Sequence, residues 1–198
     1  MSSTPNEGFT LEELKKTDID YIKAKQLVEN SKNKKLVVTS IHRINNPNVE
    51  KRYEKALKMK KIEYPQMKEV LLFHGTSWDN VNSICKHNFQ IDLCKTYDWG
   101  KMIYLTESSK LASDFPAEQI LNIDRCMFGC QVQIGNELDT DTIQAVSRRQ
   151  DSHPGYDTKY KQLVGNNGYV YFHHGIVAKW ETDEILPKFL IKYMVTTK

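Results

Sequence analysis

The later part of the chain alternates short hydrophobic, β-branched runs with polar segments that contain glycine, proline or asparagine. Runs of about four to eight such residues between turn signals are typical of strands. They predict strands at 70–74, 102–106, 128–134, 169–172, 175–180 and 188–195. Two intervening stretches, 78–86 and 108–115, are expected to form short helices.

The first part of the chain has a different pattern. Asn46 and Pro47 supply a cap and a first helical residue, and apolar side chains follow at helical spacing, so a helix is predicted over 47–62. Residues 10–13 and 17–20 both place a hydroxyl residue three positions before a carboxylate, which predicts two helical turns, the second continuing to Val28. Residues 35–44 are β-branched and predict a strand. Helices early and strands late favour an α+β domain with mainly antiparallel sheets.

Composition limits the chain to one large domain, since 198 residues are too few for two well-formed cores. We expect a single unit, 1–198, with a helical lead-in (1–34) before the main core (35–198). The net charge of +3 is small, and the lysines at 32–35 and 55–61 are read as solvated helix faces, with a phosphate- or nucleic-acid-facing patch as the alternative. No apolar run reaches the length of a membrane span, and the start lacks a secretory signal pattern.

The four cysteines contain no CxxC pair, so we expect reduced thiols in an intracellular protein, cytosolic or alternatively nuclear. We expect no metal site. The pair His173-His174 could suggest a metal or acid–base pair, but adjacent strand residues point to opposite faces.

The most informative motif is His74-Gly75-Thr76-Ser77, at the exit of the predicted strand 70–74. Glycine lets a ligand approach the backbone closely, and the flanking His74 and Thr76 offer a ring nitrogen and a hydroxyl that can bond a ribose or an amide. The motif alone is a weak indication of a nucleotide pocket.

Further motifs follow in a fixed order: Gly100-Lys101-Met102-Ile103-Tyr104-Leu105-Thr106, Ser108 to Phe115, Met127 to Val132, Tyr156-Asp157-Thr158, and Leu186 to Tyr193. In this order and spacing the chain resembles the catalytic domain of the poly(ADP-ribose) polymerase family from about Ile41 to Tyr193. The resemblance implies the ADP-ribosyltransferase fold, in which two packed, mainly antiparallel sheets flanked by helices hold NAD in the cleft between them.

The resemblance also implies site residues. His74 would bond the ribose of the adenosine half of NAD, the Gly75 backbone would read the nicotinamide carboxamide, and Tyr104 would stack on the nicotinamide ring. Phe115 would be the second stacking aromatic, where the family usually has tyrosine. The serine that normally bonds the nicotinamide amide falls on Ala112, so the neighbouring Ser113 is the candidate for that contact.

The catalytic glutamate of polymerising members aligns with Ile176, so the expected catalytic set is His74, Tyr104 and Ile176. Isoleucine cannot accept a proton or offset a positive charge. The set resembles family members that attach a single ADP-ribose and use the acceptor carboxylate to help activate the reaction. A register slip that brings in Glu181 or Glu184 remains the alternative. Tyr97 and Trp99, in a short segment over the donor site, could cover the pocket or simply pack.

These observations predict an NAD-dependent mono-ADP-ribosyltransferase. The expected partners are NAD as substrate and a protein acceptor, with a nucleic-acid end as an alternative acceptor, and we expect a monomer without a membrane or metal requirement. A catalytically inactive module that binds NAD, an ADP-ribose-like ligand or a partner protein is the competing interpretation. An RNA 2′-phosphotransferase shares the fold, but no arginine stands among these motifs to clamp an RNA phosphate.

Overall fold

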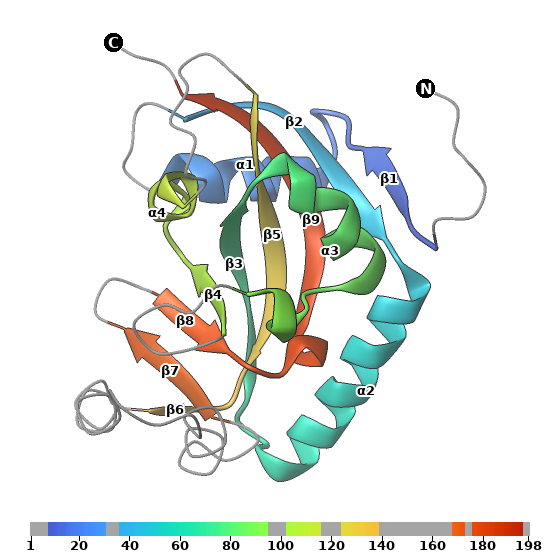
Figure 1. Cartoon of the computed structure of the whole chain (residues 1–198), viewed down its shortest axis with the longest axis vertical. Coiled ribbons are helices and arrows are strands. Elements are labelled where there is room, and N and C mark those ends of the chain that lie inside the picture. Colours follow the sequence, from blue (N-terminus) through green and yellow to red (C-terminus); the bar gives the residue numbers. More distant parts are fainter. Residues whose placement is uncertain are drawn as a thin grey trace.

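The computed structural model describes residues 8–30, 36–94, 102–115, 124–138, 168–172 and 176–195. In this part of the chain the strands form one nine-stranded sheet, in the order β1-β2-β9-β5-β3-β4-β8-β7-β6 (Figure 1). The strands are β1 (Thr10–Glu13), β2 (Leu36–Asn45), β3 (Lys68–Thr76), β4 (Ile103–Thr106), β5 (Arg125–Ile134), β6 (Asn136–Leu138), β7 (Gly168–Phe172), β8 (Ile176–Lys179) and β9 (Ile185–Val195). Neighbouring strands are antiparallel except β6 and β7, which are parallel.

The helices are α1 (Ile19–Asn30), α2 (Pro47–Glu63), α3 (Val81–His87) and α4 (Ser109–Asp114), with 3₁₀ turns at Trp78–Asn80, Ile91–Leu93 and Thr182–Glu184. The expected α+β class is confirmed. The helical turn expected at 10–13 is wrong, because these residues form the exposed edge strand β1, with Thr10 opposite Asn45 of β2. Strand β6 was not predicted.

The sheet consists of two halves that meet at a narrow junction. Strands β3 and β5 pair along the whole of β3, but within the described residues β3 and β4 pair only through Phe73 and Thr106. On the far side of this junction β4 pairs with β8 from Ile103 to Thr106. The two sheets expected from the sequence are therefore joined edge to edge by one residue pair. Beyond this pair, β3 and β4 do not pair with each other within the described residues.

Helices cover both faces of the larger half. Helix α3 lies in front in Figure 1, where Leu72 and Phe128 pack with its apolar residues. Helices α1 and α4 lie on the opposite face, where Phe73 and Met127 form the second core. Successive residues of β3 and β5 thus point alternately into the two cores, as the two-residue period of a strand requires.

Helix α2 begins where the cap was predicted. The Asn46 side chain accepts hydrogen bonds from the backbone of Asn48 and Val49, each at 3.2 Å. Its amide nitrogen donates to the carbonyl oxygens of Cys85 (2.8 Å) and Lys86 (3.0 Å), which ties the start of α2 to α3. One buried asparagine therefore fixes both the start and the position of α2.

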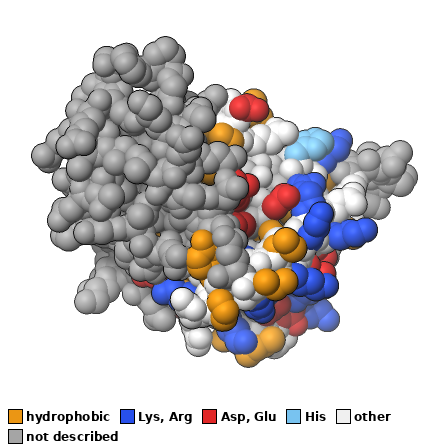
Figure 2. Space-filling model, turned by 90° about the horizontal axis from the view of Figure 1, so that it is seen from below, with side chains coloured by type: hydrophobic (Ala, Val, Ile, Leu, Met, Phe, Trp, Pro, Cys, Tyr) orange, Lys and Arg blue, Asp and Glu red, His pale blue; other side chains and the backbone are white. Residues whose placement is uncertain are grey.

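Most lysines of α2 are exposed, and the view from below shows basic and hydrophobic side chains mixed over the described surface (Figure 2). Met59 and Ile62 are among the exposed hydrophobic residues. The reading of 55–61 as a solvated face is wrong at Lys60, which is buried beside Glu184. Lys32, Lys34 and Lys35 lie outside the residues that the structure describes. None of the described helices combines the length and apolar character needed to cross a membrane.

All four cysteines are free thiols, and three of them are buried. Burial raises the pKa of Cys85 and of Cys126 to about 12, and it raises the pKa of Cys130 well above its usual value. Because the thiolate is the reactive form, these three side chains act as small core residues rather than as nucleophiles.

Candidate active site

His74 lies at the junction of the two half-sheets. Its Nδ1 is 2.9 Å from the carbonyl oxygen of Tyr104 on β4, and its ring packs edge-on against Phe89 with the ring centroids 4.8 Å apart. The His74 side chain therefore extends from β3 to β4 at the point where these two strands stop pairing. This contact brings His74 and Tyr104 together, as expected from the sequence.

The hydrogen bond to Tyr104 sets the tautomer of the His74 ring. Burial lowers the pKa of His74 below its ordinary value of 6.5, and the hydrogen bond to Tyr104 raises it by less. A carbonyl oxygen can only accept, so in the neutral ring Nδ1 carries the hydrogen and Nε2 keeps a lone pair. Nε2 is thus a hydrogen-bond acceptor suited to a hydroxyl group.

Gly75 is required by the protein's own packing. A β-carbon at this position would lie 1.8 Å from the carbonyl oxygen of Ala112 and 3.2 Å from the β-carbon of Phe115. Helix α4 therefore rests directly on the backbone of β3. The sequence suggested close approach by a ligand, and the structure adds close approach by a helix.

Tyr104 and Ile176 share one face of the smaller half-sheet. Tyr104 is opposite Ala178 and Thr106 is opposite Ile176, so these side chains project from the same side. Diagonal neighbours in such a ladder are roughly 7–8 Å apart. Val177 and Leu105 point the other way, into the core with Leu72. The expected partners Tyr104 and Ile176 are therefore neighbours, and an apolar side chain occupies the position beside the tyrosine.

Helix α4 carries the remaining candidates. Its start is fixed by Ser108, whose side chain accepts from the backbone of Leu111 at 3.2 Å. Ala112 is fully buried, and the Ser113 hydroxyl donates to the carbonyl of Lys110 at 2.6 Å. Phe115, at the end of the helix, is 39% exposed. The Ser113 hydrogen is thus directed to its own helix, whereas Phe115 presents an aromatic face to solvent.

Thr76 is buried, and its hydroxyl accepts a hydrogen bond from the side chain of Asn80 at 3.1 Å. Asn80 and Phe89 were missed by the sequence analysis, although one fixes Thr76 and the other packs on the His74 ring. Both lie in the predicted helix 78–86 or just after it, and their local pattern gives no sign of these contacts.

Glu184 does not lie with Tyr104 and Ile176. Its carboxylate forms ion pairs with Lys60 of α2 and Lys179 of β8, and Lys179 also donates to the Gln133 carbonyl at 2.6 Å. Lys179 is opposite Ile103, so it points to the face opposite Tyr104. Burial lowers the pKa of Lys179 to about 7, although Glu184 raises it. The carboxylate of Glu184 is therefore part of a buried ion cluster behind the site.

Several expectations fall on residues outside the described ranges: the possible cover at Tyr97 and Trp99, the motif 156–158, and His173-His174. Among the residues that are described, no three His, Cys, Asp or Glu side chains come close enough together to hold a metal ion.

Comparison with known families agrees with this geometry. The chain matches the sequence model of the poly(ADP-ribose) polymerase catalytic domain over residues 18–193, which includes every strand from β2 to β8 and most of β9. The match covers far more than half of the chain and spans His74, Tyr104 and Ile176. The protein therefore belongs to the poly(ADP-ribose) polymerase catalytic-domain family.

Proposed function

We propose that this protein transfers a single ADP-ribose from NAD to a protein acceptor and releases nicotinamide. The observation that carries the proposal is the position of Ile176, beside Tyr104 on the same sheet face, where polymerising relatives would carry a glutamate. Family membership supports NAD-dependent ADP-ribosyl transfer in general, and this apolar residue supports the single-transfer type.

The residues at the junction suit NAD. His74 Nε2 can accept a hydrogen bond from a ribose hydroxyl because Nδ1 is engaged with Tyr104. Gly75 lies where β3 is no longer paired with β4, so its backbone can reach an amide group. Tyr104 and the exposed Phe115 offer two aromatic rings for a flat nicotinamide.

The chain's residues act by positioning rather than by proton transfer. NAD supplies the ribose carbon that is attacked and the nicotinamide that leaves. His74 orients the ribose through a neutral ring, and the aromatic rings hold the leaving group. Ile176 offers no base, so the acceptor must arrive already able to attack. An aspartate or glutamate meets this need because its pKa of about 4 leaves it ionised at neutral pH. We therefore propose a carboxylate as the acceptor group.

Product length tests the proposal. Incubation with labelled NAD, followed by intact-mass measurement of the protein and of candidate acceptors, should give increments of one ADP-ribose per modified site. A hydrocarbon at 176 cannot polarise a ribose hydroxyl of bound ADP-ribose for a second transfer. Long polymers from the unmodified protein would contradict the proposal. Binding of NAD without any transfer would instead favour the non-catalytic module, a reading kept open by Ala112 and Ile176.

Removal of the His74 ring should lower the transfer rate by about 100-fold or more, because a misplaced ribose loses its alignment for attack. The rate with His74→Ala is measured with labelled NAD, beside a melting curve that checks the fold. His87→Ala is the control, since His87 is an exposed histidine at the end of α3. Because the pKa of His74 is lowered, the wild-type rate should not change through this group between pH 7 and 8. A folded, fully active His74→Ala protein would show that the site is assigned wrongly.

A further inference from the structure

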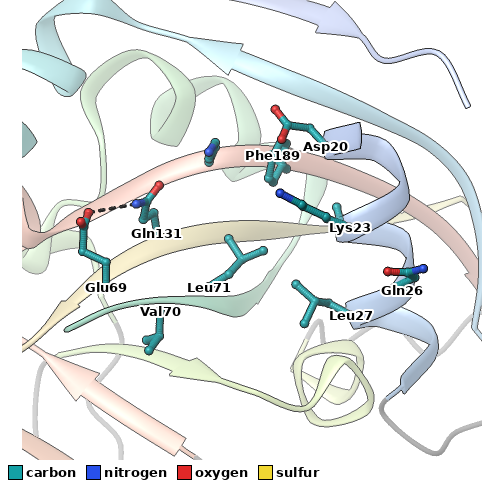
Figure 3. A pocket seen from close by; sticks show the side chains of 11 residues that line it. Asp20, Lys23, Gln26, Leu27, Glu69, Val70, Leu71, Gln131 and Phe189 are labelled. Carbon is teal, nitrogen blue, oxygen red and sulfur yellow. Dashed lines mark hydrogen bonds between the residues drawn. The ribbon is translucent and has the colours of Figure 1, made fainter. Parts of the chain in front are cut away.

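The two faces of β3 differ in how closely they are packed. On the face toward α1, Leu71 borders a cavity of about 470 Å³, and Figure 3 shows its side chain directed into that space. On the opposite face, Leu72 lies in one core with Phe89, and these two side chains are only 1% and 5% exposed. His74 follows Leu72 by two residues and therefore belongs to the closely packed face.

Phe89 packs against one side of the His74 ring. The two ring centroids are 4.8 Å apart and the ring planes meet at 70°. Phe89 also packs on Phe128, with the centroids 6.2 Å apart and the planes at 75°, and Phe128 is the residue opposite His74 in β5. Both distances fall within the range of near-perpendicular ring pairs. The three rings thus form one packed group with Phe89 in the middle.

The hydrogen bond to Tyr104 does not by itself fix the orientation of the His74 ring. The torsion that turns a histidine ring has broad minima, so a ring held at Nδ1 alone can still tilt. The perpendicular Phe89 ring limits this tilt from the side. The tilt matters because Nε2 accepts a hydrogen bond along the direction of its lone pair. Phe89 is therefore placed to decide where Nε2 points.

Asn88 directs the chain from the end of α3 to this contact. Its φ of 68° and ψ of −175° lie in a region that is almost confined to glycine and persists only where surrounding contacts hold it. The Asn88 backbone N–H donates to the Ile84 carbonyl at 2.9 Å. Its side-chain amide donates to the carbonyl oxygens of Thr182 (2.8 Å) and Ile185 (3.0 Å), and the residue is 2% exposed. Three hydrogen bonds thus hold the strained turn that precedes Phe89.

We propose that Phe89 is a positioning residue that fixes the plane of the His74 ring so that Nε2 faces the ribose hydroxyl of NAD, and that the turn at Asn88 keeps Phe89 in place. The inference rests on the proposed function for the identity of the ligand. Phe89 is almost wholly buried, whereas His74 is partly exposed, so Phe89 acts through His74 and not on NAD directly. A residue that only filled the core would affect stability without changing the state of the His74 ring.

The His74 ring is observed first, without NAD, by an NMR titration of the histidine side chains. The His74 signal is identified by its loss in His74→Ala. Phe89→Leu should raise the pKa of His74 toward its ordinary value of 6.5, because burial is what lowers it and the smaller side chain admits water. The thiols of Cys85 and Cys126, in the same core, stay neutral throughout this titration.

Val132→Ala is the control for lost packing. Val132 is fully buried in the same core and is opposite Val70, four residues from His74 along β3, or about 13 Å. This variant should lower the melting temperature and leave the pKa of His74 unchanged.

The turn is tested by two variants of Asn88. Asn88→Ala should raise the pKa of His74 as Phe89→Leu does, because the side-chain hydrogen bonds are lost while the strained φ is still required. Asn88→Gly should raise it less, since glycine adopts this φ without strain. A wild-type pKa of His74 in both variants would overturn the role of the turn, and Asn88→Gly decides alone if Asn88→Ala does not fold.

NAD binding is measured second, by titration calorimetry at pH 6 and pH 7.5. Phe89→Leu should raise the dissociation constant for NAD by about threefold to tenfold at pH 7.5, the effect of weakening one hydrogen bond. The loss should be larger at pH 6, where more His74 rings are protonated and Nε2 no longer accepts. Val132→Ala should bind NAD as the wild type does at both pH values. Phe89→Met, a second variant of similar volume, should behave as Phe89→Leu does.

A wild-type pKa of His74 together with wild-type NAD affinity in both Phe89 variants would overturn the proposal. An equal change in Val132→Ala would also overturn it, because the effect would then come from lost packing in general. The expected changes in ring titration and NAD affinity, with no transfer by the wild type, would uphold the role of Phe89 and count against the proposed transfer alone.

Discussion

Glu184→Ala should lower the free energy of unfolding by about 3–5 kcal/mol, the range for removing one partner of a buried ion pair. Glu184, Lys60 and Lys179 are all less than 10% exposed, so the substitution leaves two lysine amines in the interior without their shared carboxylate. Chemical denaturation followed by tryptophan fluorescence measures the loss. Glu184→Gln should show most of this loss in the free energy of unfolding, because an amide keeps the shape of the side chain but does not supply the negative charge.

Asp183→Ala is the matched control in the same 3₁₀ turn. Asp183 pairs with Arg52, and both side chains are nearly half exposed, so the expected loss is below about 1 kcal/mol. If Glu184→Ala proved as mild as Asp183→Ala, the cluster would contribute little to stability, and Glu184 would again become a candidate for a role in the reaction.

Gly75→Ala should abolish measurable transfer and destabilise the fold by about 1–3 kcal/mol or more, the usual range for overpacking. The new methyl group would lie 1.8 Å from the Ala112 carbonyl oxygen, which belongs to helix backbone and cannot rotate away. Helix α4 would have to move off β3, and Phe115 at its end would move with it. Labelled-NAD transfer and a melting curve, recorded side by side, separate the two effects.

Gly129→Ala provides the comparison, because Gly129 lies in β5 opposite Phe73, two residues from Gly75, and is buried in the same sheet. A β-carbon there would meet the Phe189 and Ile191 side chains at 3.4–3.5 Å, which is ordinary contact. This variant should fold and transfer ADP-ribose nearly as the wild type does. Similar behaviour of the two alanine variants would show that α4 adapts to the methyl group and that Gly75 is not needed for packing.

The local pattern of the chain was sufficient for most of the sheet and for α2. The cap at Asn46 and the strand from Lys68 to Thr76 depend on neighbouring residues, so short-range reasoning found them. It failed at Thr10–Glu13, where a capping-box pattern occurs in an edge strand whose position is set by pairing with β2 and by the ion pair of Glu12 with Arg43. Cross-strand partners outside the local window decided the structure there.

In the candidate site, too, some features could be predicted from the sequence and others depend on three-dimensional contacts. The order of motifs predicts one site with His74, Tyr104 and Ile176; in the structure the His74 ring contacts the Tyr104 carbonyl oxygen, and Tyr104 and Ile176 lie on one face of paired strands. The role of Gly75 in seating α4 needed the three-dimensional approach of the Ala112 carbonyl. The burial of Glu184 needed Lys60, which lies far away along the chain and belongs by pattern to a solvated helix.

The narrow junction between the half-sheets has a consequence for how the sequence of this protein can vary. At one end of β8, Ile176 is opposite Thr106 of β4, which is in turn opposite Phe73 of β3. At the other end, Lys179 donates to the Gln133 carbonyl of β5 and pairs with Glu184, which also pairs with Lys60 of α2. The strand that carries Ile176 is therefore held in place by a buried ion cluster on the face opposite Tyr104. We therefore expect a substitution that weakens this ion cluster both to destabilise the fold and to shift Ile176. If the proposed activity is correct, substitutions in the ion cluster should change acceptor preference over evolution, as substitutions beside Tyr104 would.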